Sequence, residues 1–263
     1  MTQALSLSDV IAHRYQPVSV ADHPMHSWTG FADYQFAQGY RTVPLIVNEV
    51  VLAAAAMPVL FQSVGTQDAR LVALLDTGPA QVITPDGRWG AAYVPGALRA
   101  HPFHARPDGS VLFDPQSPHT ARAPKGSRFF DTLGKPTPAF KAVMQFCKTY
   151  GPAQAHTQAA ATALRHAGVL IPAGTAQGLD PEVAAGLWVA DLARIKALPP
   201  DLLHKLGQSD ALTLAYAHLV SLPKIAQLKS IQGMRHGPAT QAAPSKETGG
   251  VDSFLAALAN AQS

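Results

Sequence analysis

The character of the sequence changes near Pro138, and this change limits the possible folds more than any other feature. Before Pro138, apolar residues come in short runs separated by Gly, Pro and Asp-Gly turns, a pattern typical of short β-strands. After it they recur at helical spacing, beginning with Phe140, Val143, Met144 and Cys147. The sequence therefore predicts an α+β fold, with a β-rich N-terminal half packed with a helical C-terminal half.

The individual elements follow from short apolar runs and from capping residues. Strands are expected at 43–45, 59–61, 70–75, 79–84, 111–114 and 187–190, with an edge strand and a short helix within 89–98. Helices are expected at 49–57, 139–150, 153–166, 191–198, 201–206 and from 210 onward. Gly151-Pro152 is expected to break the chain between two helices, because Pro removes a hydrogen bond inside a helix. Residues 115–138 are turn-rich and basic, and predict a long surface loop.

The chain divides into four segments by composition. Residues 1–30 predict an irregular arm, and 31–232 the main domain. Residues 233–250 are poor in apolar side chains and predict a flexible linker. Residues 251–263 form a short amphipathic docking segment, with an apolar stripe of Phe254, Leu255 and Leu258. A helix this short is not stable alone in water, so the stripe needs a surface on its own domain or on another protein.

Composition excludes several classes of protein. Hydrophobic residues make up 47% of the chain and charged residues 14%, which excludes wholesale disorder. A net charge of +3 is too mild for a nucleic-acid-binding protein. The longest apolar run, 50–61, is too short to span a membrane, and the N-terminus has no signal-peptide core, so we expect a cytoplasmic protein. The lone Cys147 excludes an internal disulfide framework and is expected to be buried.

Two stretches contain candidate binding residues. The turn Asp86-Gly87-Arg88-Trp89 places a guanidinium beside an indole, a pairing that offers planar stacking area, and Tyr93 and Arg99 follow it. The simpler interpretation, which we favour for the turn itself, is that Trp89 anchors it in the core. The second stretch is a run of cations opposed only by Asp131; it contains Arg122, Lys125, Arg128, Lys135, Lys141 and Lys148. It matches an acidic partner, or is simply a solvated face.

Histidines offer a weaker case for metal chemistry. His101 and His104 are three residues apart with His119 nearby, and His23, His26 and Glu49 match an iron site by residue type alone. Surface or core histidines are the simpler interpretation of each, and His218 is expected to be a buried helical residue beside Ser221. Phosphate-binding, dinucleotide-binding and Gly-x-Ser-x-Gly motifs are absent from the sequence. No catalytic residue, metal or cofactor is predicted.

An ordered series of short blocks over residues 15–230 resembles the SapC family of bacterial proteins. The blocks are Phe36-Ala37, Val43-Pro44-Leu45 with Glu49, Pro58–Phe61, Ala73-Leu74-Leu75, Asp86–Trp89, Tyr93-Val94-Pro95, Leu98-Arg99 with Pro102-Phe103, Asp114, Ser117-Pro118, Phe130-Asp131, Gly134, Pro136-Thr137-Pro138, Gly168-Val169-Leu170, Pro172, Leu198-Pro199, Tyr216–Leu219 and Ser221-Leu222. The sequence departs from the family pattern at Val50, after Leu75 and at 80–83. The resemblance implies an accessory protein associated with surface-layer or TonB-dependent receptor systems, and it brings no catalytic residues.

We therefore expect a non-catalytic accessory protein that binds a polypeptide or partner enzyme. Its contacts would be the 86–103 region, the 122–135 loop or both, with 251–263 as a second docking element. The alternative is a metal-dependent, protein-modifying enzyme, oxygenase-like or hydrolytic, that uses the histidines. A structural surface-layer protein is a third possibility, and the basic pI and missing signal argue against it. The oligomeric state is left open.

Overall fold

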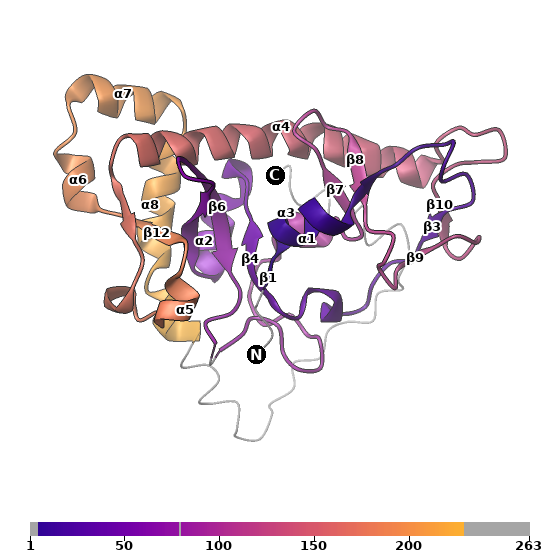
Figure 1. Cartoon of the computed structure of the whole chain (residues 1–263), viewed down its shortest axis with the longest axis horizontal. Coiled ribbons are helices and arrows are strands. Elements are labelled where there is room, and N and C mark those ends of the chain that lie inside the picture. Colours follow the sequence, from indigo (N-terminus) through magenta and orange to yellow (C-terminus); the bar gives the residue numbers. More distant parts are fainter. Residues whose placement is uncertain (1–4, 79, 229–263) are drawn as a thin grey trace.

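The computed structural model describes residues 5–78 and 80–228 and has the expected α+β architecture (Figure 1). Its main sheet has six strands; β1 and β4 are parallel, and the other neighbours are antiparallel. In spatial order the strands are β1 (Leu5–Ser6), β4 (Tyr40–Pro44), β6 (Asp68–Leu74), β5 (Val59–Val64), β12 (Leu187–Ala190) and β11 (Leu170–Pro172). The strands expected at 43–45, 59–61, 70–75 and 187–190 are all confirmed.

Two small antiparallel sheets lie at the other end of the molecule (Figure 1). One contains β10 (Ser127–Arg128), β3 (Ser27–Trp28) and β9 (Thr120–Ala121), and the other β2 (Gln16–Pro17), β8 (Val111–Phe113) and β7 (Phe103–Ala105). Phe103, Phe113 and Phe129 are fully buried, and the Phe129 ring packs tilted against Phe103 and edge-on against Phe113. Aromatic packing thus holds short strands that have few hydrogen bonds of their own.

The helices cover the main sheet and connect it to the small sheets. They are α1 (Leu7–Arg14), α2 (Val50–Ala56), α3 (Gly96–Arg99), α4 (Pro138–His166), α5 (Pro181–Ala184), α6 (Leu192–Lys196), α7 (Pro200–Gln208) and α8 (Ala211–Ser221). Helix α4 runs along most of the molecule (Figure 1). Thr137 caps its first turn by accepting a hydrogen bond from the Phe140 N–H, and Asp191 caps α6 in the same way.

The main sheet is buried on both faces. Successive residues of a strand point to opposite faces, so each strand contributes side chains to two cores. Phe61, Leu71 and Ala73 belong to the large core shared with α2, α4 and α8. Leu60 and Val72 point to the opposite face, into a smaller core with residues 179–189 and Ile225. This arrangement places α2 and α8 in one layer over one face of the sheet.

The predicted break at Gly151-Pro152 is wrong, because α4 continues through both residues. The backbone of Arg106 lies so close that a Cβ at Gly151 would overlap its carbonyl oxygen. Gly151 therefore serves a close approach between α4 and the loop before β8, rather than a turn. Buried Tyr150 and Thr157 on either side hold the helix against the core. That packing outweighs the one backbone hydrogen bond that Pro152 removes.

Three other expectations need correction. Residues 5–30 are not irregular: Ser6 caps α1, and Leu7, Val10 and Trp28 are part of the core. The edge strand expected within 89–98 is reduced to a single bridge between Ile83 and Trp89, although the short helix is present as α3. The loop 115–138 contains β9 and β10 and two buried phenylalanines, 129 and 130. The linker and the stripe of Phe254, Leu255 and Leu258 lie outside the described residues.

Candidate functional site

The turn at Asp86 is a well-ordered surface feature. Asp86 accepts hydrogen bonds from the Thr84 hydroxyl and the Arg88 guanidinium, the latter at 2.6 Å. Both bonds lower the pKa of the Asp86 carboxyl, and the bond from Thr84 has the larger effect. The side chains of Arg88 and Asp86 are 75% and 56% exposed, so water screens their ion pair. Of the residues predicted in this stretch, these two are presented to solvent.

Trp89 anchors the turn, as the simpler interpretation of the sequence predicted. Its indole Nε1–H donates to the backbone oxygen of Tyr93 at 2.8 Å, and its ring packs against Tyr34 with centroids 5.1 Å apart. The indole is half-buried against the core. Its one hydrogen-bond donor is therefore already engaged within the chain.

Tyr93 and Arg99 meet at a buried carboxylate, that of Glu49, which the sequence suggested as a helix-start residue and, by residue type alone, as an iron ligand with His23 and His26. Glu49 Oε2 accepts hydrogen bonds from the Tyr93 hydroxyl (2.8 Å) and the Gly96 N–H (2.7 Å). Its Oε1 accepts from the Ile46 N–H (3.1 Å) and the Tyr150 hydroxyl (3.4 Å). We call Glu49 and these four donors the Glu49 clamp.

The clamp joins α2, α3 and α4 through one side chain that is 4% exposed. Burial is the main influence on Glu49 and raises its pKa, while the hydrogen bonds from Gly96 and Tyr93 partly oppose this. Arg99 lies at the edge, with Nη2 3.4 Å from the Tyr93 hydroxyl and its guanidinium over the Tyr93 ring. The structure thus brings Trp89, Tyr93 and Arg99 together, in a cluster bonded within the chain.

The histidine pairs do not converge on a metal site among the described residues. His101 is buried, stacks on Phe36 with centroids 3.7 Å apart, and bonds Ser117 through Nε2 at 2.8 Å. Burial lowers the pKa of His101 to about 3 and that of His104 to about 4. His23 and His26 contact each other in a separate aromatic cluster. Within 5–78 and 80–228, no three His, Cys, Asp or Glu side chains are grouped to hold a metal.

The larger of two surface hollows in the described part of the chain is one that the sequence did not predict, and we call it the α4 groove. It has a volume of about 880 Å³. It is lined by Val18, Val20, Asp108, Gly109, Ser110, Val111, Phe130, Gly134, Pro136, Phe140, Lys141, Met144, Gln145 and Lys148. Helix α4 contributes one wall through residues spaced three and four apart, which therefore lie along one helical face. Buried aromatic rings form the floor, and Val20 and Met144 are 46% and 40% exposed.

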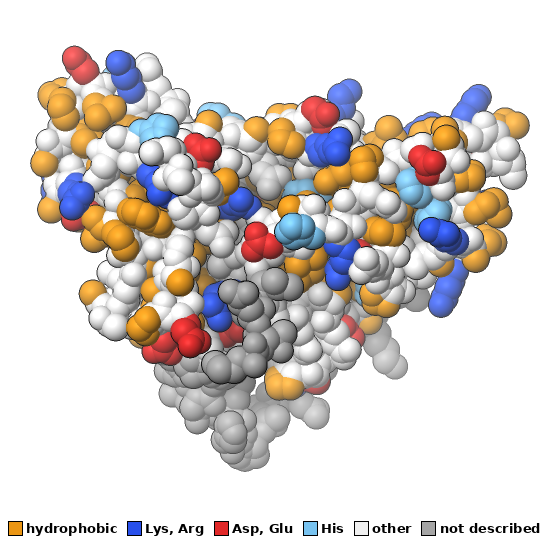
Figure 2. Space-filling model, in the orientation of Figure 1, with side chains coloured by type: hydrophobic (Ala, Val, Ile, Leu, Met, Phe, Trp, Pro, Cys, Tyr) orange, Lys and Arg blue, Asp and Glu red, His pale blue; other side chains and the backbone are white. Residues whose placement is uncertain are grey.

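Two lysines line this groove, and other cations of the basic stretch lie near it in the sequence. Lys141 and Lys148 belong to its lining, and Lys135 lies between lining residues 134 and 136. Arg122 and Lys125 lie between β9 and β10 in the chain, and Arg128 lies on β10. This is the end of the molecule where Figure 2 shows Lys and Arg side chains among hydrophobic ones. Asp108 is the one acidic residue of the lining. The predicted basic stretch therefore adjoins an apolar hollow, which the sequence alone did not reveal.

A comparison with protein-family models gives a match to SapC over residues 18–228, most of the chain. The chain belongs to the SapC family. No curated protein and no solved structure matches it. The matched range contains the whole α4 groove and the whole Glu49 clamp, so both are built within the SapC domain. No helix among the described residues of this SapC chain is long and apolar enough to cross a membrane.

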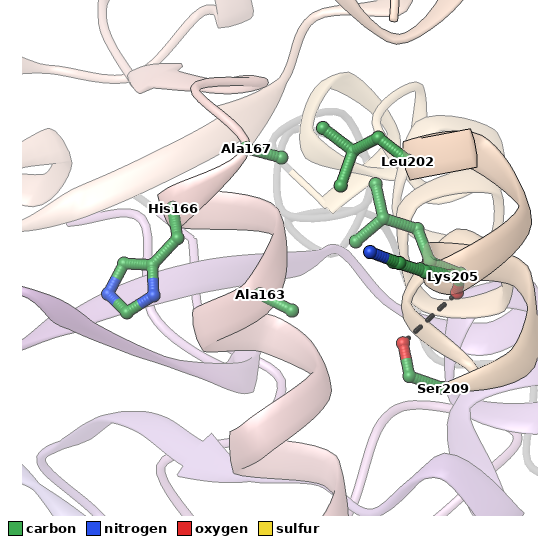
Figure 3. Close-up of a pocket in the computed structure, with 7 residues that line it drawn as sticks. Ala163, His166, Ala167, Leu202, Lys205 and Ser209 are labelled. Carbon is green, nitrogen blue, oxygen red and sulfur yellow. Dashed lines mark hydrogen bonds between the residues drawn. The ribbon is translucent and has the colours of Figure 1, made fainter. Parts of the chain in front are cut away.

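The SapC domain has a second, smaller hollow of about 420 Å³ between the end of α4 and α7 (Figure 3). Ala163, Ala167, Leu202 and Leu206 form most of its lining, and its Ser209 hydroxyl donates to the Leu206 backbone. Figure 3 shows the His166 ring pointing away from α7. A ligand site needs polar groups that converge on the ligand, and this hollow does not bring them together.

Proposed function

We propose that this SapC protein is a non-catalytic accessory protein, and that the α4 groove binds an acidic, amphipathic peptide segment of a partner protein. One observation carries the proposal: an apolar hollow of about 880 Å³ lies directly beside Lys141 and Lys148. Such a volume is within the usual range for a binding pocket, ~300–1,000 Å³. The predicted link with surface-layer or TonB-dependent receptor systems stays a prediction.

The chemistry of the lining determines what fits. Phe130, Phe140 and Val111 supply an apolar floor for two or three aliphatic or aromatic anchors. The exposed Met144 can adapt to anchors of different shape, because its side chain is unbranched and polarizable. The two lysines are two helical turns apart on α4, about 10 Å by helix rise. Carboxylates two turns apart on a bound helix match that spacing.

A peptide display experiment tests this proposal. The full chain is used to select binders from a random-peptide library, and the selected peptides are titrated by fluorescence anisotropy. We expect acidic, amphipathic sequences whose affinity falls as salt rises, because exposed charges are screened. The double variant Lys141→Glu/Lys148→Glu should bind them at least about 10-fold more weakly, since like charges then face one another.

Lys205→Glu provides the matched control, because Lys205 is an exposed lysine of the smaller hollow on α7. It makes the same Lys-to-Glu change at one position. It should leave peptide affinity within about 2-fold, as expected for a charge that lies beyond the Debye length from the groove. Selection of neutral or basic peptides, or equal binding to the double variant and the wild type, would refute the assignment of the groove.

A further inference from the structure

Helices α2 and α8 expose an unusual amount of apolar surface. On α2, Val51 and Leu52 are 67% and 53% exposed; on α8, Tyr216 and Val220 are 47% and 73% exposed. Neither helix contains a Lys, Arg, Asp or Glu residue. A helix that is hydrophobic on all sides is normally covered on all sides. Single exposed apolar residues need no explanation, whereas a continuous patch marks a contact surface.

Both helices pack side by side on one side of the sheet, and the four exposed residues lie on the helix faces opposite that core. The inward faces of α2 and α8 are closely packed: Val50, Ala53, Leu214 and Ala215 are fully buried in the large core. The opposite faces therefore point away from the sheet. On α8 the exposed residues 213, 216 and 220 follow helical spacing and form one stripe. We call this surface the α2/α8 face.

Hydrogen bonds hold the α2/α8 face rigidly on its support. Deep in α8, His218 Nδ1 is 2.6 Å from the Val59 carbonyl oxygen and Nε2 accepts from the Ala190 N–H at 3.0 Å. The Ser221 hydroxyl oxygen accepts from the Val59 N–H at 2.9 Å. Because Nδ1 must donate while Nε2 accepts, His218 is neutral, and burial lowers its pKa to about 4. A preorganised surface of this kind costs little entropy to bind.

We propose that a second copy of this chain covers the α2/α8 face, giving a two-fold symmetric dimer. A two-fold interface uses the same patch of both copies, so a charged residue near the axis would face the same charge on the other copy. A face without charged residues on either helix meets that condition. Homodimer interfaces are also the most apolar class, and packing α2 and α8 against their symmetry mates yields a four-helix arrangement. The α4 groove contributes no residue to this face, so a dimer would carry two grooves.

Sedimentation of the full chain at about 1–100 µM tests the dimer, since this range brackets micromolar dissociation constants. We expect a two-chain mass for the wild type. The variants Leu52→Lys/Val220→Lys and Leu52→Glu/Val220→Glu should each weaken association at least about 100-fold, because like charges would meet across the interface. Mixing the two variants should restore a heterodimer. Only contact between two copies at this face predicts that recovery.

The control is Leu133→Lys/Leu192→Lys, which adds the same charge at apolar positions that are 78% and 40% exposed outside the face. It should sediment as the wild type does. A one-chain mass for the wild type at the highest concentration overturns the proposal, as does a dimer that both charged variants leave unchanged. The proposal is also overturned if the wild type is a monomer and the variant Phe254→Asp/Leu258→Asp is a dimer. That result would assign the face to the chain's own C-terminal segment.

Discussion

Replacing Glu49 by Gln changes one atom of the clamp from an acceptor to a donor. Both carboxylate oxygens face a backbone N–H: Oε2 that of Gly96, and Oε1 that of Ile46. A hydroxyl could rotate to suit the new group, but a backbone N–H can only donate. Whichever way the Gln amide is turned, its NH₂ group faces an N–H and leaves that donor without a partner.

The cost follows from the burial of the site. An unsatisfied buried donor costs about 1–3 kcal/mol, and we take about 2 kcal/mol for Glu49→Gln. In a domain of this size, that lowers the melting temperature by about 4–8 °C. A protonated carboxyl avoids this penalty, because its O–H oxygen still has a lone pair for the N–H while the proton goes to a tyrosine hydroxyl.

The penalty should also depend on pH, in a direction set by the raised pKa of Glu49. Because the folded protein binds this proton more tightly than the unfolded chain does, the associated stability is fully present below the ordinary pKa of 4.5. It is lost as pH rises towards the folded pKa. The gap between wild type and Glu49→Gln is therefore largest at acidic pH and narrows as pH increases.

Thermal unfolding followed by circular dichroism, at several pH values, measures both effects. The matched control is Glu182→Gln, at an exposed position, which should melt as the wild type does. If Glu49→Gln melts within about 1 °C of the wild type at pH 5, then the clamp does not hold the elements together as its geometry requires. A gap that widens with rising pH would contradict the sign of the pKa shift.

Three further predictions concern close packing and buried histidines. Gly151→Ala should cost about 3 kcal/mol or more in chemical denaturation because α4 must move away from a backbone oxygen, whereas Gly207→Ala, which has room for a Cβ, should be neutral or stabilising. His218→Leu should cost about 2 kcal/mol by leaving the Ala190 N–H without an acceptor and by removing one of two side-chain hydrogen bonds to the Val59 carbonyl, and an unchanged urea midpoint would contradict this. Burial lowers the pKa values of His101, His104 and His218 from 6.5, so the free energy of unfolding should fall as pH drops below 6.5. Each histidine contributes up to about 1.4 kcal/mol per pH unit, and a urea midpoint that stays constant between pH 7 and 5 would contradict the prediction.

Elements with a local signal could be predicted from the sequence. Residues 59–61 of β5 and 71–74 of β6 are continuous apolar runs because both faces of the sheet are buried there. Asp191 marks the start of α6 because its side chain satisfies two free N–H groups there. Gly151-Pro152 gives a local signal for a break, but packing on both sides of these residues keeps α4 continuous. The N-terminal residues give a weak helix signal because α1 is short, with only Leu7 and Val10 of it buried.

The site was harder to predict, because its parts are distant in the sequence. Tyr93 and Tyr150 reach Glu49 across 44 and 101 positions, and nothing local distinguishes Glu49 from an ordinary first-turn acid. A tyrosine in a binding motif and a tyrosine in an internal clamp look the same in sequence. The α4 groove is built from several separate segments, and the sequence indicated only its basic side.

The clamp explains how two separate surfaces can occur on one small domain. Glu49 directly precedes α2, which carries half of the α2/α8 face, and Tyr150 lies on α4 two residues beyond Lys148 of the groove. Each surface exposes apolar side chains, which gives the chain no stability of its own. The elements that carry them must therefore be fixed from behind, by groups fully satisfied within the chain. Trp89, Tyr93 and Arg99, which the sequence suggested as binding residues, lie on that inner support, whereas the α4 groove and the α2/α8 face are the surfaces that we propose for contacts with other molecules.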